Sequence, residues 1–261
     1  MALLKDWILP GMLVVLALTP GCSREKGAES AATAEPAVQM ADLVMGEGAA
    51  LASGDYFTVH YKGWLWVDGQ KGEVFEDTYQ FRSPPTFRLG RDQVIPGWDE
   101  GLLGMRVGGK RSLLLPPEKG FGSVASARIP PGSTLYFEIE LLDIPTVQHE
   151  VLVPTTGPLA EEGDQVDIHY TAWIAANGEK GMRFDSTHDR GTSFSFSLGA
   201  GQVLNGLDLG VTGMQVGEKR LIRIPPALGY GERGMQQGGR QVVPPDATLL
   251  FEVELLSILG K

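Results

Sequence analysis

The chain of 261 residues contains 35 glycines and 17 prolines and has a formal net charge of −10. This length allows two small domains, and an apolar content of 43% is sufficient for packed cores, which excludes a wholly disordered chain. The acidic charge would repel phosphate backbones, so we expect no nucleic-acid partner. The glycines and prolines recur at intervals typical of short strands joined by turns.

The first segment predicts export and a lipid anchor. Residues 1–21 contain a lysine and then the apolar run 12–18, which is too short to span a bilayer but has the length of a cleavable signal. The segment ends before Cys22, the only cysteine, at the place where a bacterial lipoprotein signal, which it resembles, has its acylated residue. An ordinary secretory signal with an incidental cysteine is the alternative. Residues 22–42 lack apolar periodicity, which indicates a flexible tether.

Most of the remaining chain is one pattern present twice. The triplet at 59–61 (VHY) recurs at 168–170 (IHY), offset by 109 residues. After Gly231 the offset becomes 114, because the second copy has five extra residues before Pro244. A repeat unit of this size is a domain and not a solenoid repeat. We therefore predict one domain over 43–145 and a second over 146–261.

Short strands dominate each copy. In the first copy we predict strands at 56–66, 111–115 and 134–142, from their aromatic and β-branched residues. A further strand at 149–153 is expected to begin the second domain. Within 134–142 the apolar residues alternate and share one face of the strand. These residues are Leu135, Phe137, Ile139 and Leu141.

One helix is predicted in each copy, at 97–105 and at 206–214. Trp98, Leu102 and Met105 are spaced by four and three residues, so they share one helical face. The predicted fold class is α+β, with an antiparallel β-sheet wrapped around one short helix in each domain.

The order of the motifs resembles that of the FKBP-type peptidyl-prolyl cis-trans isomerases. The second copy has these motifs: IHY at 168–170, FDS at 184–186, VLNG at 203–206, GYG at 229–231 and PPDATLLFEVELL at 244–256. The resemblance covers about 165–259 well and about 54–144 with departures. It implies two tandem FKBP-like domains that isomerise Xaa-Pro bonds and assist the folding of exported proteins. It implies no cofactor.

The chemistry of this reaction explains the residue types. An Xaa-Pro bond rotates over a barrier of about 18–20 kcal/mol, and its twisted transition state loses amide resonance. An apolar pocket that excludes water favours this less polar state, so neither a nucleophile nor a metal is required. The four histidines do not cluster, and His60 and His169 are expected to face away from the pocket.

The resemblance places the better site in the second copy. Asp185 is expected near the substrate carbonyl, with Arg190 keeping it ionised, and Tyr230 is expected to offer its hydroxyl to the substrate backbone. Leu207 stands where the family often has tryptophan, which we expect to widen the floor of the pocket. The residues implied to line this site, with Tyr170 and Phe184 among its catalytic residues, are Tyr170, Phe184, Phe194, Val203, Leu204, Leu207 and Phe251.

The first copy departs from the pattern. Glu76 replaces the aspartate, Phe121 replaces the tyrosine and Pro85 stands at the position of Phe194. Arg82 is the expected substitute for Arg190. We therefore predict a weak catalyst or a binding module in the first domain. Its implied pocket residues are Tyr61, Phe75, Val94, Ile95, Trp98, Phe121 and Phe137.

Three functions compete at this point: a prolyl isomerase, a peptide-binding chaperone with little turnover, and an envelope spacer. The extra residues of the second copy, in 232–241, predict either a specificity flap over the pocket or a tolerated surface insertion. The expected partners are proline-containing polypeptides and, through Cys22, a membrane, with no metal. The expected location is the bacterial cell envelope, at the periplasmic face of the outer membrane.

Overall fold

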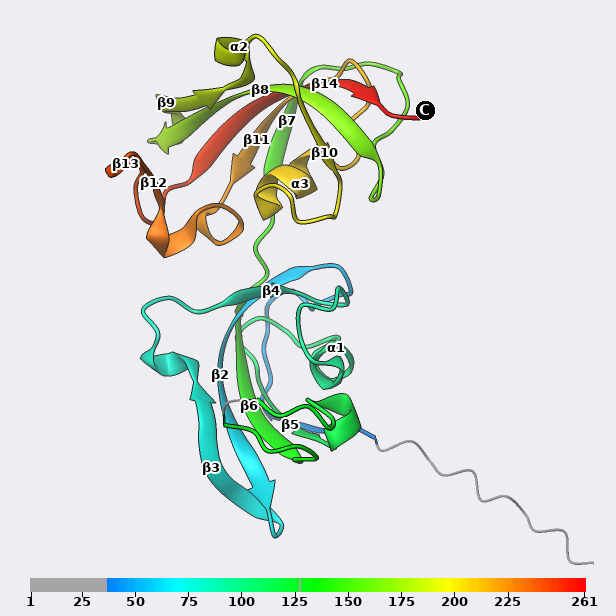
Figure 1. Cartoon of the computed structure of the whole chain (residues 1–261), viewed down its shortest axis with the longest axis vertical. Helices are drawn as coiled ribbons and strands as arrows, with labels where there is room; N and C mark the ends of the chain where they lie inside the picture. The colour runs from blue at the N-terminus through cyan, green and yellow to red at the C-terminus, as the bar shows by residue number, and fades with distance from the viewer. Residues whose placement is uncertain (1–36, 127) are drawn as a thin grey trace, which may run out of the picture. The chain divides into compact units, whose positions relative to one another are not determined.

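The computed structural model describes residues 37–126 and 128–261, which form two domains built on one plan (Figure 1). The predicted signal at 1–21, Cys22 and most of the predicted tether lie outside these residues. Within the described ranges, no helix is both long and apolar enough to cross a bilayer.

The first domain is a six-stranded antiparallel sheet with the order β1-β5-β6-β2-β3, in which β4 also pairs with β2. The strands are β1 (Gln39–Val44), β2 (Tyr56–Val67), β3 (Gln70–Asp77), β4 (Thr86–Arg88), β5 (Lys110–Leu115) and β6 (Leu135–Asp143). The three predicted strands correspond to β2, β5 and β6. Leu135, Phe137, Ile139 and Leu141 are at most 3% exposed, so the predicted alternation in β6 is confirmed.

The boundary of the predicted tether at residue 42 is wrong. Residues from Gln39 onward form β1, which pairs with β5 through Gln39 and Leu114. All six residues of β1 (QMADLV) are exposed. Apolar and polar residues do not alternate in this sequence, so the strand could not be predicted from a period of two. It forms because β5 would otherwise present unpaired backbone groups at the sheet edge.

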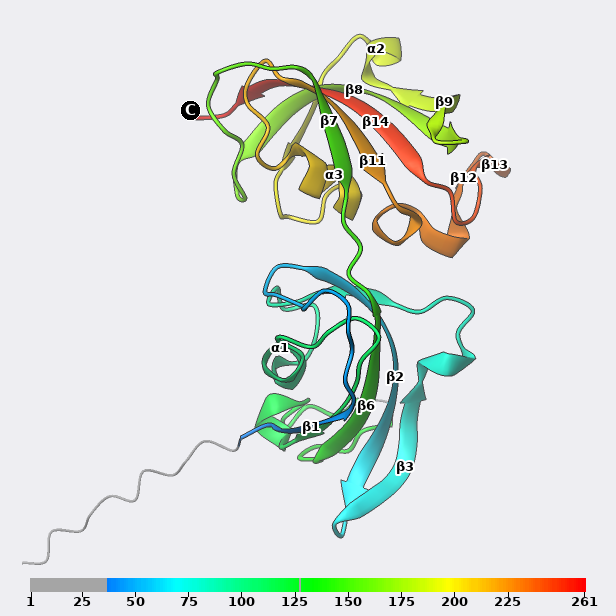
Figure 2. The ribbon, with the colours of Figure 1, turned by 180° about the vertical axis from the view of Figure 1, so that it is seen from behind.

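The sheet of the first domain curves around α1 (Pro96–Gly101), as Figures 1 and 2 show. Trp98, Leu102 and Met105 are all buried, as predicted, but only Trp98 lies within the helix, so the three residues do not share one helical face. The helix is shorter than predicted. The chain turns at Gly104, whose φ of +74° belongs to the left-handed region that glycine adopts without steric cost.

The second domain repeats this plan, with the sheet order β10-β8-β14-β11-β7 and β9 beside β8. The sheet packs on α3 (Asn205–Val211), which is also shorter than the predicted helix. The predicted strand at 149–153 corresponds to β7. The strands are β7 (Gln148–Val153), β8 (Gln165–Ala176), β9 (Glu179–Ser186), β10 (Phe194–Ser197), β11 (Lys219–Ile224) and β14 (Leu249–Ile258), and β9 leads into α2 (Thr187–Arg190).

The extra residues of the second copy form a separate two-stranded hairpin. Strands β12 (Met235–Gln237) and β13 (Arg240–Val243) are joined by Gly238 and Gly239, whose φ values are +58° and +77°. Positive φ at both central residues is the requirement of the tight turn that matches strand twist. Met235 packs against the core of the domain.

Candidate active sites

The second domain has a cavity of about 360 Å³. The nine residues predicted for this site all line it, together with Gln202, which was not predicted. The lining residues are Tyr170, Phe184, Asp185, Phe194, Gln202, Val203, Leu204, Leu207, Tyr230 and Phe251. No residue of 232–241 is among them. Residues 235–237 and 240–243 pair with each other in a separate two-stranded sheet.

The sheet brings the aromatic walls together from four strands. Tyr170 on β8 lies opposite Val253 of β14, which places its ring beside Phe251, 5.6 Å away between centroids. Phe184 on β9 meets Phe251 edge to face at 6.1 Å, and Phe194 on β10 meets Tyr170 at 6.2 Å. Rings at these distances attract one another beyond their area of burial, so the walls are held in place without a ligand.

Asp185 is the centre of the polar part of this cavity. The Tyr170 hydroxyl donates to its Oδ2 at 2.5 Å, and Arg190 donates from Nη1 to its Oδ1 at 2.5 Å. Arg190 also donates from Nη2 to the Tyr170 hydroxyl at 3.1 Å. The predicted pairing of Arg190 with Asp185 is therefore confirmed.

These contacts set the protonation of the pair. Burial alone would raise the pKa of Asp185, but hydrogen bonds from Tyr170 and Arg190 outweigh it and hold the pKa below its usual value. Burial, and then the bond to Asp185, raises the pKa of Tyr170 to about 12. At neutral pH the carboxylate is therefore ionised and the phenol keeps its proton.

We expect kcat/KM of the second domain to be flat between about pH 5 and pH 9, because neither Asp185 nor Tyr170 titrates there. The depressed pKa of Asp185 also stabilises the folded state at pH values above the unfolded pKa, and this stabilisation is lost as pH falls through the folded pKa. A pH series of proline isomerisation tests the flat kcat/KM profile, with Asp185→Asn as the control that has no carboxylate to titrate. A bell-shaped profile centred near pH 6.5 would contradict it and implicate a histidine.

A buried threonine fixes the backbone of each pocket tyrosine. Thr187 Oγ1 accepts from the Tyr170 amide at 2.9 Å and donates to the Tyr170 carbonyl at 3.1 Å. Thr78 makes the same two bonds to Tyr61, at 2.8 and 3.1 Å. Both threonines are fully buried, so these bonds form in a dry environment and hold the tyrosine ring over the cavity.

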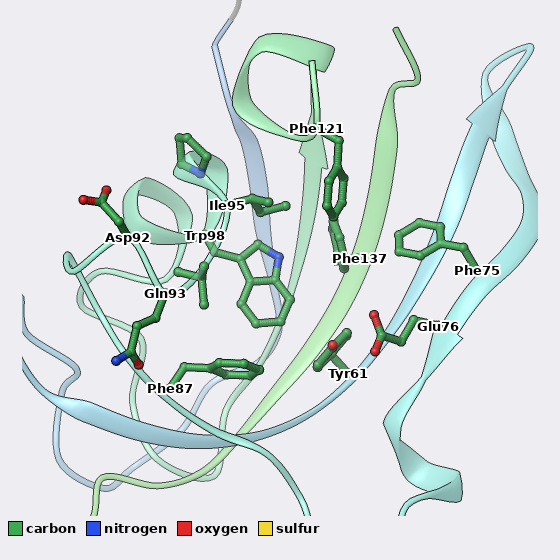
Figure 3. A pocket seen from close by; sticks show the side chains of 12 residues that line it. Tyr61, Phe75, Glu76, Phe87, Asp92, Gln93, Ile95, Trp98, Phe121 and Phe137 are labelled. Atoms are coloured by element: carbon green, nitrogen blue, oxygen red, sulfur yellow. The ribbon is translucent and has the colours of Figure 1, made fainter. Parts of the chain in front are cut away.

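The first domain has its own cavity, of about 410 Å³ (Figure 3). All seven residues predicted for this site line it. The other five were not included in that prediction. The lining residues are Tyr61, Phe75, Glu76, Phe87, Asp92, Gln93, Val94, Ile95, Pro96, Trp98, Phe121 and Phe137.

The predicted role of Arg82 in the first domain is wrong. The Arg82 side chain is 87% exposed and makes no ion pair with Glu76, because it belongs to the long connection between η1 (Thr78–Gln80) and β4. On the side of the wall where Pro85 replaces an aromatic residue, Phe87 lines the cavity and meets Trp98 edge to face at 6.0 Å. In the second domain the matching residue, Phe196, is 2% exposed and belongs to the core.

The cavity of the second domain is no larger than that of the first, although leucine replaces tryptophan at its floor. The cavity above Leu207 has about 360 Å³, against about 410 Å³ above Trp98. The second domain contributes Phe194 to its wall at the position of Pro85.

The residues that were missed had a signal in the repeat. Gln93 and Gln202 occur at equivalent positions, and each accepts a hydrogen bond from a strand amide, of Arg88 at 2.8 Å and of Ser197 at 2.9 Å. Their recurrence in both copies could have identified them. His60 and His169 line neither cavity, as predicted. Among the described residues, no three His, Cys, Asp or Glu side chains are grouped to hold a metal ion.

Comparison with known proteins agrees with this architecture. The model of the FKBP-type peptidyl-prolyl cis-trans isomerase family matches residues 48–142 and 157–256. The human protein named peptidyl-prolyl cis-trans isomerase FKBP9 is 36% identical over 214 residues, which are 80% of this chain and 35% of that protein. FK506-binding protein 2B of Rhizopus delemar is 47% identical over 133 residues, 49% of this chain and 60% of that protein.

Among solved structures, the crystal structure of the three FKBP domains of wheat FKBP73 has 26% identity and a TM-score of 0.38, covering 85% of this chain and 94% of that one. The chain spans about a third of the length of the curated relatives FKBP9 and FKBP10. Two antiparallel sheets, each with an aromatic cavity, define a tandem-domain protein. The chain belongs to the FKBP-type peptidyl-prolyl cis-trans isomerases, a family of enzymes, and has two FKBP domains.

Proposed function

We propose that this chain isomerises Xaa-Pro bonds in exported polypeptides and that the second domain performs most of the catalysis. The observation that supports this most directly is the Tyr170–Asp185–Arg190 arrangement at an aromatic cavity. Among the described residues of the first domain, Glu76 has no equivalent ion pair, and Phe121 stands in place of a tyrosine.

The proposed mechanism is non-covalent. The proline ring enters between Tyr170, Phe251 and Leu207, which excludes water from the bond that rotates. Asp185, held ionised by Arg190, faces the substrate carbonyl carbon that loses resonance. The Tyr230 ring lines the same cavity and meets Phe184 edge to face at 6.4 Å, so its hydroxyl is placed to donate to the substrate backbone. These contacts favour the twisted amide over either planar isomer.

A peptide assay with the full chain tests the proposal. We expect the cis-to-trans rate of an Ala-Leu-Pro-Phe peptide to rise in proportion to chain concentration. The competing function is a chaperone that holds peptides without turnover. Suppression of the aggregation of an unfolded protein, with no change in the isomerisation rate, would overturn catalysis in favour of that function.

We further propose that the chain is attached to the bacterial cell envelope through lipid on Cys22, at the periplasmic face of the outer membrane. The support is the position of the only cysteine directly after an apolar segment of signal length. A single acyl chain binds a bilayer only marginally, so stable attachment needs more than one chain.

Expression in a Gram-negative host tests the anchor. The full chain should partition into the detergent phase and the outer-membrane fraction, and the Cys22→Ala variant should move to the aqueous phase. Equal partitioning of both forms would contradict lipidation. Because residue 22 lies outside both domains, the isomerase activity of the two forms should agree.

A further inference from the structure

The cavity of the first domain combines aromatic rings with carboxylates. Six of its lining side chains are aromatic, and Glu76 and Asp92 lie on opposite sides of these rings (Figure 3). None of the twelve lining residues is basic. Aromatic faces and carboxylates both attract cations, so the two features favour the same kind of ligand.

Neither carboxylate is neutralised within the described residues. The neighbouring Asp77 forms an ion pair with Lys62, with 2.9 Å between Oδ2 and Nζ. Asp77 does not line the cavity. Arg128 lines an adjacent groove that also contains Glu76, but no ion pair joins the two side chains. Glu76 accepts a hydrogen bond from the Tyr61 hydroxyl but has no cation beside it, and Asp92 is exposed at the edge of the cavity, so both charges act on a cation that approaches the cavity.

The second domain lacks this feature. Its only lining carboxylate, Asp185, is paired with Arg190 at 2.5 Å, and the position of Asp92 is occupied by Gly201. The two cavities thus differ in charge more than in size or in aromatic content. A peptide that discriminates between the domains should do so through the charge beside its proline.

A hydrogen-bond donor completes the first cavity. The indole Nε1 of Trp98 is buried and has no hydrogen-bond partner in the described part of the chain. The residue is 3% exposed and forms the floor on which a proline ring would rest. A buried donor without a partner costs free energy until an acceptor, such as a peptide carbonyl, reaches it.

We infer that the first domain selects prolyl peptides with a basic side chain next to the proline, and that Glu76 and Asp92 determine this selectivity. The inference rests on the proposed function, because it takes the cavity to be a prolyl-peptide site. The proline ring packs on Trp98, and the neighbouring ammonium or guanidinium group lies against the aromatic rim between the two carboxylates. The second domain, with a neutralised carboxylate, shows no such preference.

Peptides that differ only in charge test the inference on the full chain. The series is acetyl-Gly-Xaa-Pro-Gly-amide and acetyl-Gly-Pro-Xaa-Gly-amide, with Xaa as lysine, norleucine or glutamate. Norleucine has the length of lysine without its charge. The Trp98 indole N–H resonance reports binding to the first domain alone, since this indole lines that cavity.

In at least one series, we expect lysine to bind about tenfold more tightly than norleucine at low salt, and glutamate to bind more weakly than norleucine. The lysine preference should fall to about twofold in Glu76→Gln/Asp92→Asn and at 1 M salt, where screening is strong. The matched control is Asp68→Asn/Glu73→Gln, which removes the same charge from exposed positions outside the cavity and should keep the preference.

Equal binding of lysine and norleucine, or a preference that survives Glu76→Gln/Asp92→Asn, would overturn the inference. Failure of every peptide to shift the Trp98 resonance would also overturn it, while leaving catalysis by the second domain standing. A lysine preference in a chain that does not accelerate isomerisation would support the inference and refute the catalytic proposal.

Discussion

Replacing Asp185 by alanine should reduce kcat/KM for proline isomerisation by about tenfold to a hundredfold, since hydrogen bonds to a charged group contribute about 1.5–3 kcal/mol. The substitution removes the acceptor of the Tyr170 hydroxyl and leaves Arg190 without its ion-pair partner. Tyr230→Phe, which deletes one neutral donor, should cost about threefold to tenfold. Both are measured on the full chain with a neutral Leu-Pro peptide.

The first domain supplies the comparison. Phe121 occupies the position of Tyr230 and has no hydroxyl, so Phe121→Ala should change the same rate by less than about twofold if the second domain dominates. Circular dichroism of each variant separates loss of catalysis from loss of fold. Comparable losses from Asp185→Ala and Phe121→Ala would refute the division of labour between the domains, though not catalysis itself.

The largest expected loss of stability follows from Arg220→Met in the second domain. Arg220 and Glu218 are 6% and 4% exposed and share a hydrogen bond from Nε to Oε1 of 2.7 Å. Arg220 also donates to the carbonyl of Gly210 at the end of α3, at 2.9 Å. The substitution leaves the Glu218 carboxylate buried without its charge partner, which costs about 3–5 kcal/mol of unfolding free energy.

Urea unfolding, with hydrogen exchange of the β11 and β14 amides to isolate the second domain, measures this loss. The matched variant is Arg111→Met in the first domain, where the partner Asp42 is 33% exposed and water can solvate it. That variant should lose about 1–2 kcal/mol. Adding Glu218→Gln to Arg220→Met should recover part of the stability, and no recovery would mean that the buried charge is not the cause.

The pocket residues could be predicted because both copies carry motifs in the order that resembles the FKBP pattern. Tyr61 and Tyr170, or Phe137 and Phe251, occupy matching positions in strands whose alternation sends them to one face. Long, strongly patterned strands constrain their own register, since a shift of one residue would expose the whole apolar set. The same pattern identified β6 and its buried residues to within one residue at each end.

Features that depend on contacts distant in sequence could not be predicted in this way. Strand β1 has only exposed residues and exists because β5 offers it an edge. Phe87 and Phe196 match in sequence, yet one lines a cavity and the other is core, because Pro85 and Phe194 fill different volumes beside them.

Two domains of one fold could be predicted from the amino-acid sequence alone, because the repeat and the strand alternation are both visible in the order of the residues, and the aromatic sites followed from the resemblance of the motifs to the FKBP pattern. Which charges are paired depends on the tertiary structure. Arg190, on the short α2, reaches Asp185, whereas Arg82, on a longer connection, lies in solvent away from Glu76. Ion pairing depends on distance between side chains in space, and that distance is set by the packing of the whole domain.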